Sequence, residues 1–298
     1  MTAALREAYA YCESVTRRSH STFELAISLV LRPRRQALQA IYAFCRLADD
    51  AVDLPGRAAR DAIAAVDSMR RRLREAFAGK PDGPLFIALI DAAKRFQIPL
   101  PRFEEIIDGV SMDLDRGRYP TFEALLSYCH RVASSVGLAC VHVFGFRDRF
   151  ALEAAVDLGI ALQLANILRD LKEDAELGRI YLPAEDLKRF GVSEQDILQG
   201  RRTPQFLELM KFEVARAREY FDRGERLFAC LSRWIRPCPI AMACAYRKIL
   251  NSIEAHGYDV FTHRVRLTRS QRTLVLAATA LRTVLAGRSY HLIPRSLS

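Results

Sequence analysis

Apolar residues recur every three or four positions along most of this chain, which is the spacing of a helix that buries one face. The segments with this spacing are about 5–17, 23–31, 33–54, 103–112, 160–174, 205–229, 240–256 and 272–285. No stretch alternates apolar and polar residues over a strand length, and glycine is scarce, at 14 of 298 residues. The breaks at Gly79–Pro84 and Pro99–Pro101 are too short for domain linkers. The pattern therefore predicts an all-α helical bundle, with residues 1–298 in a single domain.

Polar residues interrupt the apolar segment 160–174 in a regular way. They are Gln163, Asn166, Asp170 and Asp174. Because successive residues of a helix turn by about 100°, these four fall within roughly 80° of one another. Leucine and isoleucine flank them on both sides, so the polar stripe lies inside an apolar surface. Buried carboxylates need a partner, and this stripe therefore points to a bound cation.

A second stripe of the same kind lies upstream, in AIYAFCRLADDAVD. Its members are Tyr42, Arg46, Asp49 and Asp53. Their spacings of four, three and four place them within about 60° on a helix. Asp50 points away from Asp49 and is the weaker candidate ligand. The segment thus repeats the design of two aspartates, four apart, in an apolar setting.

Two such helices, facing each other, would surround a common space with carboxylate and amide oxygens. These oxygens suit a hard divalent cation that keeps part of its water shell, such as Mg²⁺. A cluster of this kind can bind a diphosphate and assist its departure. A helix cap or a solvated acidic end is the alternative for either aspartate pair taken alone.

Further candidates for binding an anion lie near these stripes. Gly178 permits a turn and Pro183 stops the helix, which folds Arg179 and Tyr181 back toward the second aspartate pair. Arg179 is a candidate for holding a leaving diphosphate, and a surface ion pair with Glu176 is the alternative.

The hydroxyl groups of Ser21 and Thr22 follow Arg17 and Arg18 and could hold phosphate oxygens. An ordinary N-cap for the next helix is an equally good interpretation. The small residues of the run from Ser134 to Ala139 either let two helices approach closely or leave room for a long apolar guest.

The content of charged residues, cysteine and histidine limits which classes of partner and metal site are expected. The formal net charge of +10 can attract any anionic partner. The Arg-rich segment at 70–74 is interpreted as a solvated helix face, because neither interleaved aromatic residues nor a DNA-binding motif accompanies it, so no nucleic-acid partner is expected. The seven cysteines contain no CxxC and fit a reducing, cytoplasmic location, and the six histidines show no zinc spacing.

Neither a signal peptide nor a membrane anchor is expected. The apolar segment TLVLAATALRTVLAG near the end is short and contains Arg282. It is interpreted as an amphipathic helix, and peripheral contact with the inner membrane surface, through which an apolar product would leave, is kept as an alternative.

Four motifs together, YAFCRLADDAVD, YCHRVASSVG, LQLANILRDLKEDAELGRIYLP and YRKILNSIEAHGYDVF, closely resemble the squalene and phytoene synthase family. The resemblance covers nearly the whole chain. It implies a single-domain, all-α isoprenoid synthase bundle with a central cavity. It also implies a prenyltransferase that joins two allylic prenyl diphosphates head to head, with release of diphosphate.

The resemblance also implies roles for individual residues. Asp49 and Asp53 would face Asp170 and Asp174 across the cavity and, with Asn166, bind Mg²⁺, for which Mn²⁺ could substitute. The residues that it places at the diphosphate sites or the cavity mouth are Tyr42, Arg46, Gln163, Asn166, Arg169, Tyr246 and Arg264, and Ser21, Thr22 and Phe23 match the flap near the first substrate. Arg179 and Tyr181, in the turn after Asp174, complete the candidate substrate-binding residues. No clear NADPH signature accompanies these motifs, so a reductive second step is left open.

One motif departs from the family pattern. Well-known squalene and dehydrosqualene synthases carry a tyrosine one or two residues beyond the cysteine of a Tyr-Cys pair, whereas His130 and Arg131 follow Cys129 here. The segment VASSVGLACVHVFG looks more like bacterial enzymes that make presqualene diphosphate, a C30 product, from two farnesyl diphosphates than like the phytoene enzymes. A phytoene synthase acting on geranylgeranyl diphosphate and a non-catalytic scaffold relative are the alternatives.

Overall fold

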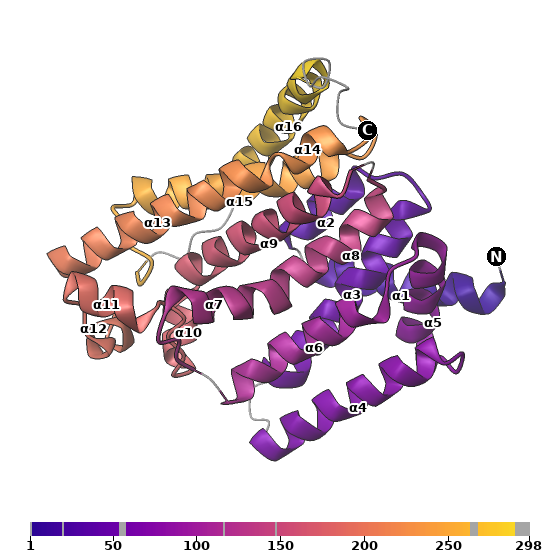
Figure 1. Ribbon diagram of the computed structural model, residues 1–298, viewed down its shortest axis with the longest axis horizontal. Helices are drawn as coiled ribbons and strands as arrows, with labels where there is room; N and C mark the ends of the chain where they lie inside the picture. Colours follow the sequence, from indigo (N-terminus) through magenta and orange to yellow (C-terminus); the bar gives the residue numbers. More distant parts are fainter. Residues whose placement is uncertain are drawn as a thin grey trace.

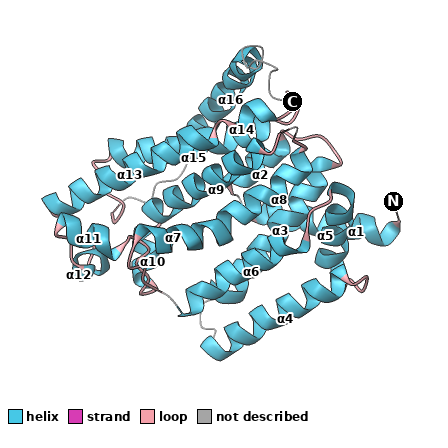
Figure 2. Cartoon of the chain, in the orientation of Figure 1, coloured by secondary structure: helices cyan, strands magenta, loops and turns pink. Residues whose placement is uncertain are grey.

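The computed structural model describes residues 2–19, 21–53, 58–115, 117–146, 148–262 and 268–289. Helices account for 78% of the structure, and the described ranges contain no strand (Figures 1 and 2). The prediction of an all-α fold is therefore confirmed. The assignment of all residues to one domain stays a prediction.

The helices follow one another with short connections. In chain order they are α1 (Ala3–Arg18), α2 (Thr22–Ser28), α3 (Arg34–Asp53), α4 (Ala59–Phe77), α5 (Gly83–Phe96), α6 (Leu100–Asp115), α7 (Phe122–Cys129), the π-helix η1 (His130–Ser134), α8 (Ser135–Phe144), α9 (Phe150–Arg169), α10 (Leu171–Glu176), α11 (Ala184–Phe190), α12 (Glu194–Leu198), α13 (Pro204–Gly224), α14 (Leu227–Cys230), α15 (Pro237–Ala255) and α16 (Arg269–Ser289).

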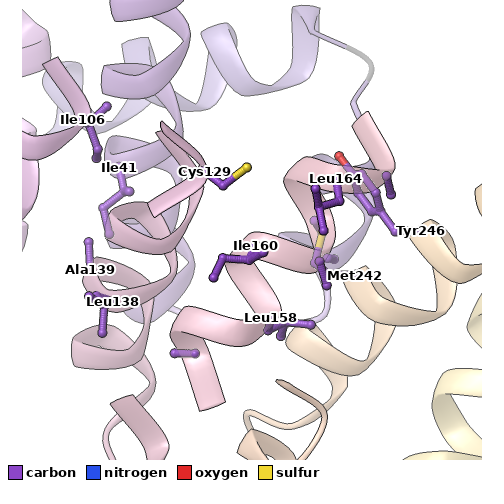
Figure 3. Packing of buried hydrophobic residues seen from close by; sticks show 14 of the residues in the cluster. Ile41, Ile106, Cys129, Leu138, Ala139, Leu158, Ile160, Leu164, Met242 and Tyr246 are labelled. Atoms are coloured by element: carbon purple, nitrogen blue, oxygen red, sulfur yellow. The ribbon is translucent and has the colours of Figure 1, made fainter. Parts of the chain in front are cut away.

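Helix α9 occupies the centre of the bundle. It is apolar on nearly all sides, from Ala151 to Leu168, and a helix of this composition is stable only when other helices surround it. Its neighbours include α8, α13, α15 and η1, while α4 and α6 lie toward one edge (Figure 1). Apolar side chains from α1 to α15 form one connected core. Figure 3 shows part of it, where Met242 and Tyr246 of α15 lie beside Leu158 and Leu164 of α9.

Local capping explains several helix boundaries. Thr121 caps α7, and its Oγ1 accepts a hydrogen bond from the Ala124 backbone N–H at 3.2 Å. Ser21 caps α2 in the same way, with its Oγ 3.4 Å from the Glu24 amide. The interpretation of Ser21 as an N-cap is therefore confirmed.

Two predicted helices are interrupted. The segment 160–174 does not form one helix, because α9 ends at Arg169 and the backbone of Asp170 (φ −98°, ψ 17°) leaves the helical region before α10 begins. The segment 205–229 likewise divides into α13, which ends at Gly224, and α14, which starts at Leu227. Periodicity continues across both breaks, so the sequence pattern alone does not reveal them.

The Arg-rich segment of α4 is not simply a solvated face. Arg70 pairs with Asp108 and Arg74 with Glu104, each at 2.7 Å, which joins α4 to α6. Arg72 pairs with Asp82 at 3.2 Å. Arg71 is exposed and the Arg74 side chain is 60% exposed, so the interpretation as a solvated face holds for these two, while the Arg70 side chain is 25% exposed and contacts α6.

Small residues allow α9 to approach η1 and α8 closely. A Cβ atom added to Gly159 of α9 would lie 2.6 Å from the Ser134 Cα, and one added to Gly137 would lie 3.1 Å from the Ala155 carbonyl oxygen. The Ser134 hydroxyl donates to the Val156 carbonyl across the same contact, at 2.9 Å. The interpretation of the small run as a close helix approach is therefore correct.

Two segments, Phe122–Phe144 and Phe150–Arg169, are long and apolar enough to cross a membrane by length and composition alone. In the fold, 44% and 61% of their most apolar windows are buried, and a core helix meets the same criteria. A cytoplasmic location and contact with the inner membrane surface stay predictions.

A buried charge cluster joins α11 to α13. The Arg216 guanidinium donates to Asp186 at 2.8 Å and to both Glu213 oxygens at 3.0 Å, and it lies 3.9 Å from the centre of the Phe122 ring. Glu213 is 2% exposed. Burial raises the pKa of Glu213 to about 8, with Asp186 adding to the rise and Arg216 opposing it.

This pKa predicts that stability depends on pH. Since the pKa of Glu213 is higher in the folded state than its ordinary value of 4.5, the folded state binds this proton more tightly than the unfolded state. The resulting stabilisation is complete below about pH 4.5 and is lost as the pH rises through about 8. Glu213→Gln should therefore flatten the decline in the free energy of unfolding between about pH 5 and 8, measured by urea titration. Glu219→Gln, at an exposed site of α13, is the matched control. An equally steep decline in the Glu213 variant would contradict this explanation.

Candidate active site

A cavity of about 450 Å³ lies between α3, α9 and α15, and α2, α6, η1 and α8 also contribute to its wall. One part of the wall is apolar and is formed by Phe23, Ala26, Ile27, Leu38, Ile41, Val132, Val136, Cys140, Phe144, Ala155, Leu158, Leu162, Leu227, Cys238, Pro239 and Met242. The other part is polar and is formed by Tyr42, Arg46, Asp49, Asp113, Tyr128, Gln163, Asn166, Arg169, Asp170, Asp174, Arg179, Tyr181 and Tyr246. The cavity therefore suits a ligand with a charged head and an apolar tail.

The first predicted stripe contributes one side of the polar wall. Tyr42, Arg46 and Asp49 of α3 all line the cavity. The Arg46 guanidinium also pairs with Asp50, one turn along the helix, at 2.7 Å. The side chain of Asp53 lies outside the described residues, so its predicted role stays untested. The helix α3 therefore presents the face that the spacing predicts, as far as Asp49.

The second stripe lines the same cavity despite the break at Asp170. Gln163 and Asn166 on α9, Asp170 between the helices and Asp174 on α10 all belong to its wall. The stripe survives because backbone hydrogen bonds of the i to i−4 type continue on both sides, from Asp170 to Asn166 at 2.8 Å and from Asp174 to Asp170 at 2.9 Å. The structure therefore brings Asp49, Asp170 and Asp174 to one cavity.

Asn166 carries an unpaired oxygen at the centre of this wall. Its Nδ2 donates to Gln163 Oε1 at 3.2 Å, while its Oδ1 is buried and has no hydrogen-bond partner. A buried acceptor without a partner costs about 1–3 kcal/mol. A cation or a ligand donor that binds beside Asn166 would remove this cost.

Arg169 is held between Asp170 and Tyr246. Its Nε donates to Asp170 Oδ1 at 2.7 Å, and a second N–H of the same guanidinium donates to the other carboxylate oxygen. Burial by itself would lower the pKa of Arg169, but its bonds to Asp170 and Tyr246 raise it above the ordinary value. Burial raises the pKa of Tyr246, and the neighbouring Arg169 guanidinium opposes the rise. Arg169 therefore stays a fixed positive charge at the cavity wall.

Asp113 is a cavity residue that sequence reasoning missed. Its Oδ1 accepts a hydrogen bond from the Tyr181 hydroxyl at 2.7 Å, and its Oδ2 accepts one from the Tyr128 hydroxyl at 3.1 Å. The sequence signal was weak: Asp113 follows the cavity residue Val110 by three positions, so both share one face of α6. Nothing in that spacing indicates the two tyrosines, which come from distant segments.

The remaining predicted residues fall into three groups. Phe23, Arg179 and Tyr181 line the cavity, so the turn after Asp174 does return to it. Ser21 and Thr22 are not among the lining residues, and the Ser21 hydroxyl is used as the α2 cap. Arg264 lies outside the described residues.

The donor set fits a hydrated Mg²⁺ ion better than a metal held by protein alone. Within the described ranges, no group of three or more His, Cys, Asp or Glu side chains is close enough to hold a metal ion. Mg²⁺ usually keeps several waters and binds through one or two carboxylates and substrate phosphates. The carboxylates of the cavity and the unpaired Asn166 oxygen supply oxygen donors of this kind.

Comparison with known proteins gives consistent matches over nearly the full length. The squalene/phytoene synthase family matches residues 16–271. A 15-cis-phytoene synthase from Synechococcus elongatus is 40% identical over 292 residues, with 94% of each protein covered. A dehydrosqualene synthase crystallised with a ligand is 29% identical and has a TM-score of 0.88, over 94% of this chain and 98% of that one. A squalene synthase from Alicyclobacillus acidocaldarius is 32% identical, with a TM-score of 0.80 over 87% and 97% of the two chains.

Proposed function

Because the chain belongs to the squalene/phytoene synthase family of prenyltransferases, we propose that it joins two geranylgeranyl diphosphates head to head, as a phytoene synthase does. The observation that carries this choice is the 40% identity to a 15-cis-phytoene synthase over 94% of both proteins. The similar C30 enzymes of known structure share 29% and 32%. The preference for two farnesyl diphosphates, drawn from the sequence, is not confirmed and becomes the second candidate.

The polar wall is proposed to bind the two diphosphate groups. Asp49, Asp170 and Asp174, with the Asn166 oxygen, would hold Mg²⁺ there. When bound, Mg²⁺ would neutralise negative charge on the diphosphate and so favour cleavage of the carbon–oxygen bond. The arginines of the wall act in the same direction, because a guanidinium stabilises the charge that develops on the leaving diphosphate.

Arg179 lies in the turn that follows Asp174 and lines the cavity, next to the proposed metal site. Arg169 also lines the cavity, and it donates to the Asp170 carboxylate. We therefore propose that Arg179 contacts the departing diphosphate and that Arg169 orients the Asp170 carboxylate.

The apolar wall is proposed to protect the allylic cation. Side chains such as Ile41, Leu158 and Leu162 offer no nucleophile and exclude water, which would otherwise convert the cation into an alcohol. The double bond of the second substrate then attacks the cation. Loss of one proton closes a cyclopropane ring.

The test is incubation of the purified protein with geranylgeranyl or farnesyl diphosphate, Mg²⁺ or Mn²⁺, and NADPH either present or absent. We expect pyrophosphate release and a C40 product from geranylgeranyl diphosphate, at a kcat/KM at least about tenfold higher than with farnesyl diphosphate, which is a preference of about 1.4 kcal/mol. Mass spectrometry of the products identifies chain length and the fate of the cyclopropyl intermediate. A C30 product alone would reject the proposed substrate, and no pyrophosphate release from either substrate would reject the proposed reaction.

A further inference from the structure

The turn after α10 carries Arg179, which contacts the leaving diphosphate in the proposed reaction, and the following inference rests on that role. Gly178, with a positive φ of 74°, reverses the chain at this turn. The Arg179 backbone N–H donates to the Asp174 carbonyl oxygen at 2.8 Å, which closes the end of α10. Local bonds of this kind do not order a long side chain, and ordering it when a ligand binds reduces the affinity. Contacts from elsewhere in the fold therefore matter for Arg179.

The segment between α6 and α7 supplies such contacts. Ile180 donates its backbone N–H to the Gly117 carbonyl oxygen at 2.9 Å, and Ile180 forms an isolated parallel β-bridge with Arg118. Gly117 also lies close to Arg179 itself. A Cβ atom added to Gly117 would lie 4.0 Å from the Arg179 Cγ and 3.4 Å from the Gly178 carbonyl oxygen. Two segments that are far apart in the sequence thus run side by side where Arg179 begins.

The Arg118 guanidinium joins these two segments. Its Nη1 donates to the Gly117 carbonyl oxygen at 2.7 Å and to the Gly178 carbonyl oxygen at 2.8 Å. Its Nε donates to Oε2 of Glu194, the first residue of α12, at 2.7 Å. Arg118 is not among the residues that line the cavity. It therefore holds the carbonyl group directly before Arg179 from outside the proposed diphosphate site.

The bond to Gly178 fixes more than one atom. The Gly178 carbonyl group and the Arg179 nitrogen belong to the same planar peptide unit, so a bond that orients this carbonyl also orients the backbone from which the Arg179 side chain starts. The donor carries a positive charge, and hydrogen bonds of this kind are stronger than those between neutral groups. Glu194 in turn fixes the plane of the guanidinium. The direction of Arg179 is thus set by a chain of contacts that reaches α12.

We propose that Arg118 is a positioning residue for the diphosphate and that it acts through Arg179. By fixing the peptide between Gly178 and Arg179, it keeps the Arg179 side chain directed into the cavity before the ligand binds. Less conformational freedom is then lost on binding, and the guanidinium meets the leaving diphosphate at the required position. Arg118 itself exchanges no proton and forms no covalent bond in this role.

A double-mutant cycle tests whether Arg118 acts through Arg179. Wild type, Arg118→Met, Arg179→Met and the double variant are titrated with inorganic pyrophosphate and Mg²⁺ in a calorimeter. We expect the dissociation constant to rise about fivefold in Arg118→Met and at least about tenfold in Arg179→Met. Adding Arg118→Met to Arg179→Met should change it by less than about twofold. With the prenyl diphosphate that wild type converts, kcat should fall at least about tenfold in Arg118→Met, since misplacing a group by about 1 Å can lower a rate 10²-fold.

Arg201→Met is the matched control. The Arg201 side chain is 60% exposed, pairs with Asp196 of α12 at 3.5 Å and does not line the cavity. Its removal should leave the pyrophosphate affinity and kcat at the wild-type values. An equal loss in this variant would overturn the proposal in favour of a general effect of positive charge.

Three further outcomes would also overturn the proposal. They are additive losses in the cycle, a lower unfolding temperature of Arg118→Met with unchanged pyrophosphate affinity, and absence of pyrophosphate binding by wild type. Should Arg118→Met not fold, Arg118→Lys takes its place in the cycle, because it keeps the charge and loses the forked donors, and the same loss of coupling is expected. If wild type binds pyrophosphate but converts neither prenyl diphosphate, the proposed function fails, while the binding cycle still decides the role of Arg118.

Discussion

Replacing Asp170 with asparagine is expected to lower kcat about 10³-fold while the unfolding temperature changes little. Loss of one group that stabilises charge in a transition state commonly costs about 10²–10³-fold, and Asp170 combines the proposed metal site with the orientation of Arg169. Its carboxylate is 24% exposed and lines the cavity, so asparagine keeps the shape and removes only the charge. Initial rates at saturating Mg²⁺ and a thermal melt measure the two quantities.

A control for this variant lies on α9 itself. Asp157 pairs with Arg223 at 3.8 Å, away from the cavity lining, so Asp157→Asn should keep most of the activity. Equal loss of activity in both variants would contradict a specific role of Asp170, because it would show that removal of either carboxylate charge has the same effect. An unfolded Asp170→Asn protein would instead indicate a structural role for this carboxylate.

Replacing Gly159 with alanine is expected to destabilise the fold by about 3 kcal/mol, although alanine is the better helix former by about 1 kcal/mol. The added methyl group would lie 2.6 Å from the Ser134 Cα and 2.8 Å from its backbone nitrogen. Backbone atoms cannot rotate away as a side chain can, so α9 and η1 must separate. Urea unfolding measures the loss, which should appear as a lower midpoint with a similar slope.

The opposite substitution at an exposed site supplies the comparison. Ala215→Gly lies on the solvent side of α13, where only intrinsic helix propensity applies, and should cost about 1 kcal/mol. A Gly159→Ala protein that equals or exceeds the stability of wild type would mean that η1 moves aside easily. Because Gly159 also lines the cavity, the same variant should change the affinity for prenyl diphosphates.

The sequence predicted the cavity wall wherever spacing along one helix decides which side chains lie together. Tyr42, Arg46 and Asp49 are four and three residues apart, and α3 is regular, so its apolar flanks place all three on the cavity face. The stripe from Gln163 to Asp174 was also predicted, although the break at Asp170 was not. That break lies between two segments of helical periodicity, and only packing in three dimensions shows which residue leaves the helix.

Other features depended on residues that are far apart in the chain. Asp113 accepts hydrogen bonds from Tyr128 and Tyr181, which lie 15 and 68 residues further along the chain. Arg70 of α4 pairs with Asp108 of α6. The hydroxyl of Ser21 illustrates the reverse case, because a local cap explains it without a ligand.

By itself, then, the sequence determined the all-helical class, the family motifs and two acidic helix faces. Each of these follows from residues within about one or two turns of one another, where helix geometry is fixed in advance. The tertiary structure alone decided that both faces line one cavity and that Asp113 joins two distant tyrosines there. Contacts between distant segments depend on how side chains of all the helices pack together, and the spacing within one segment carries no information about that packing.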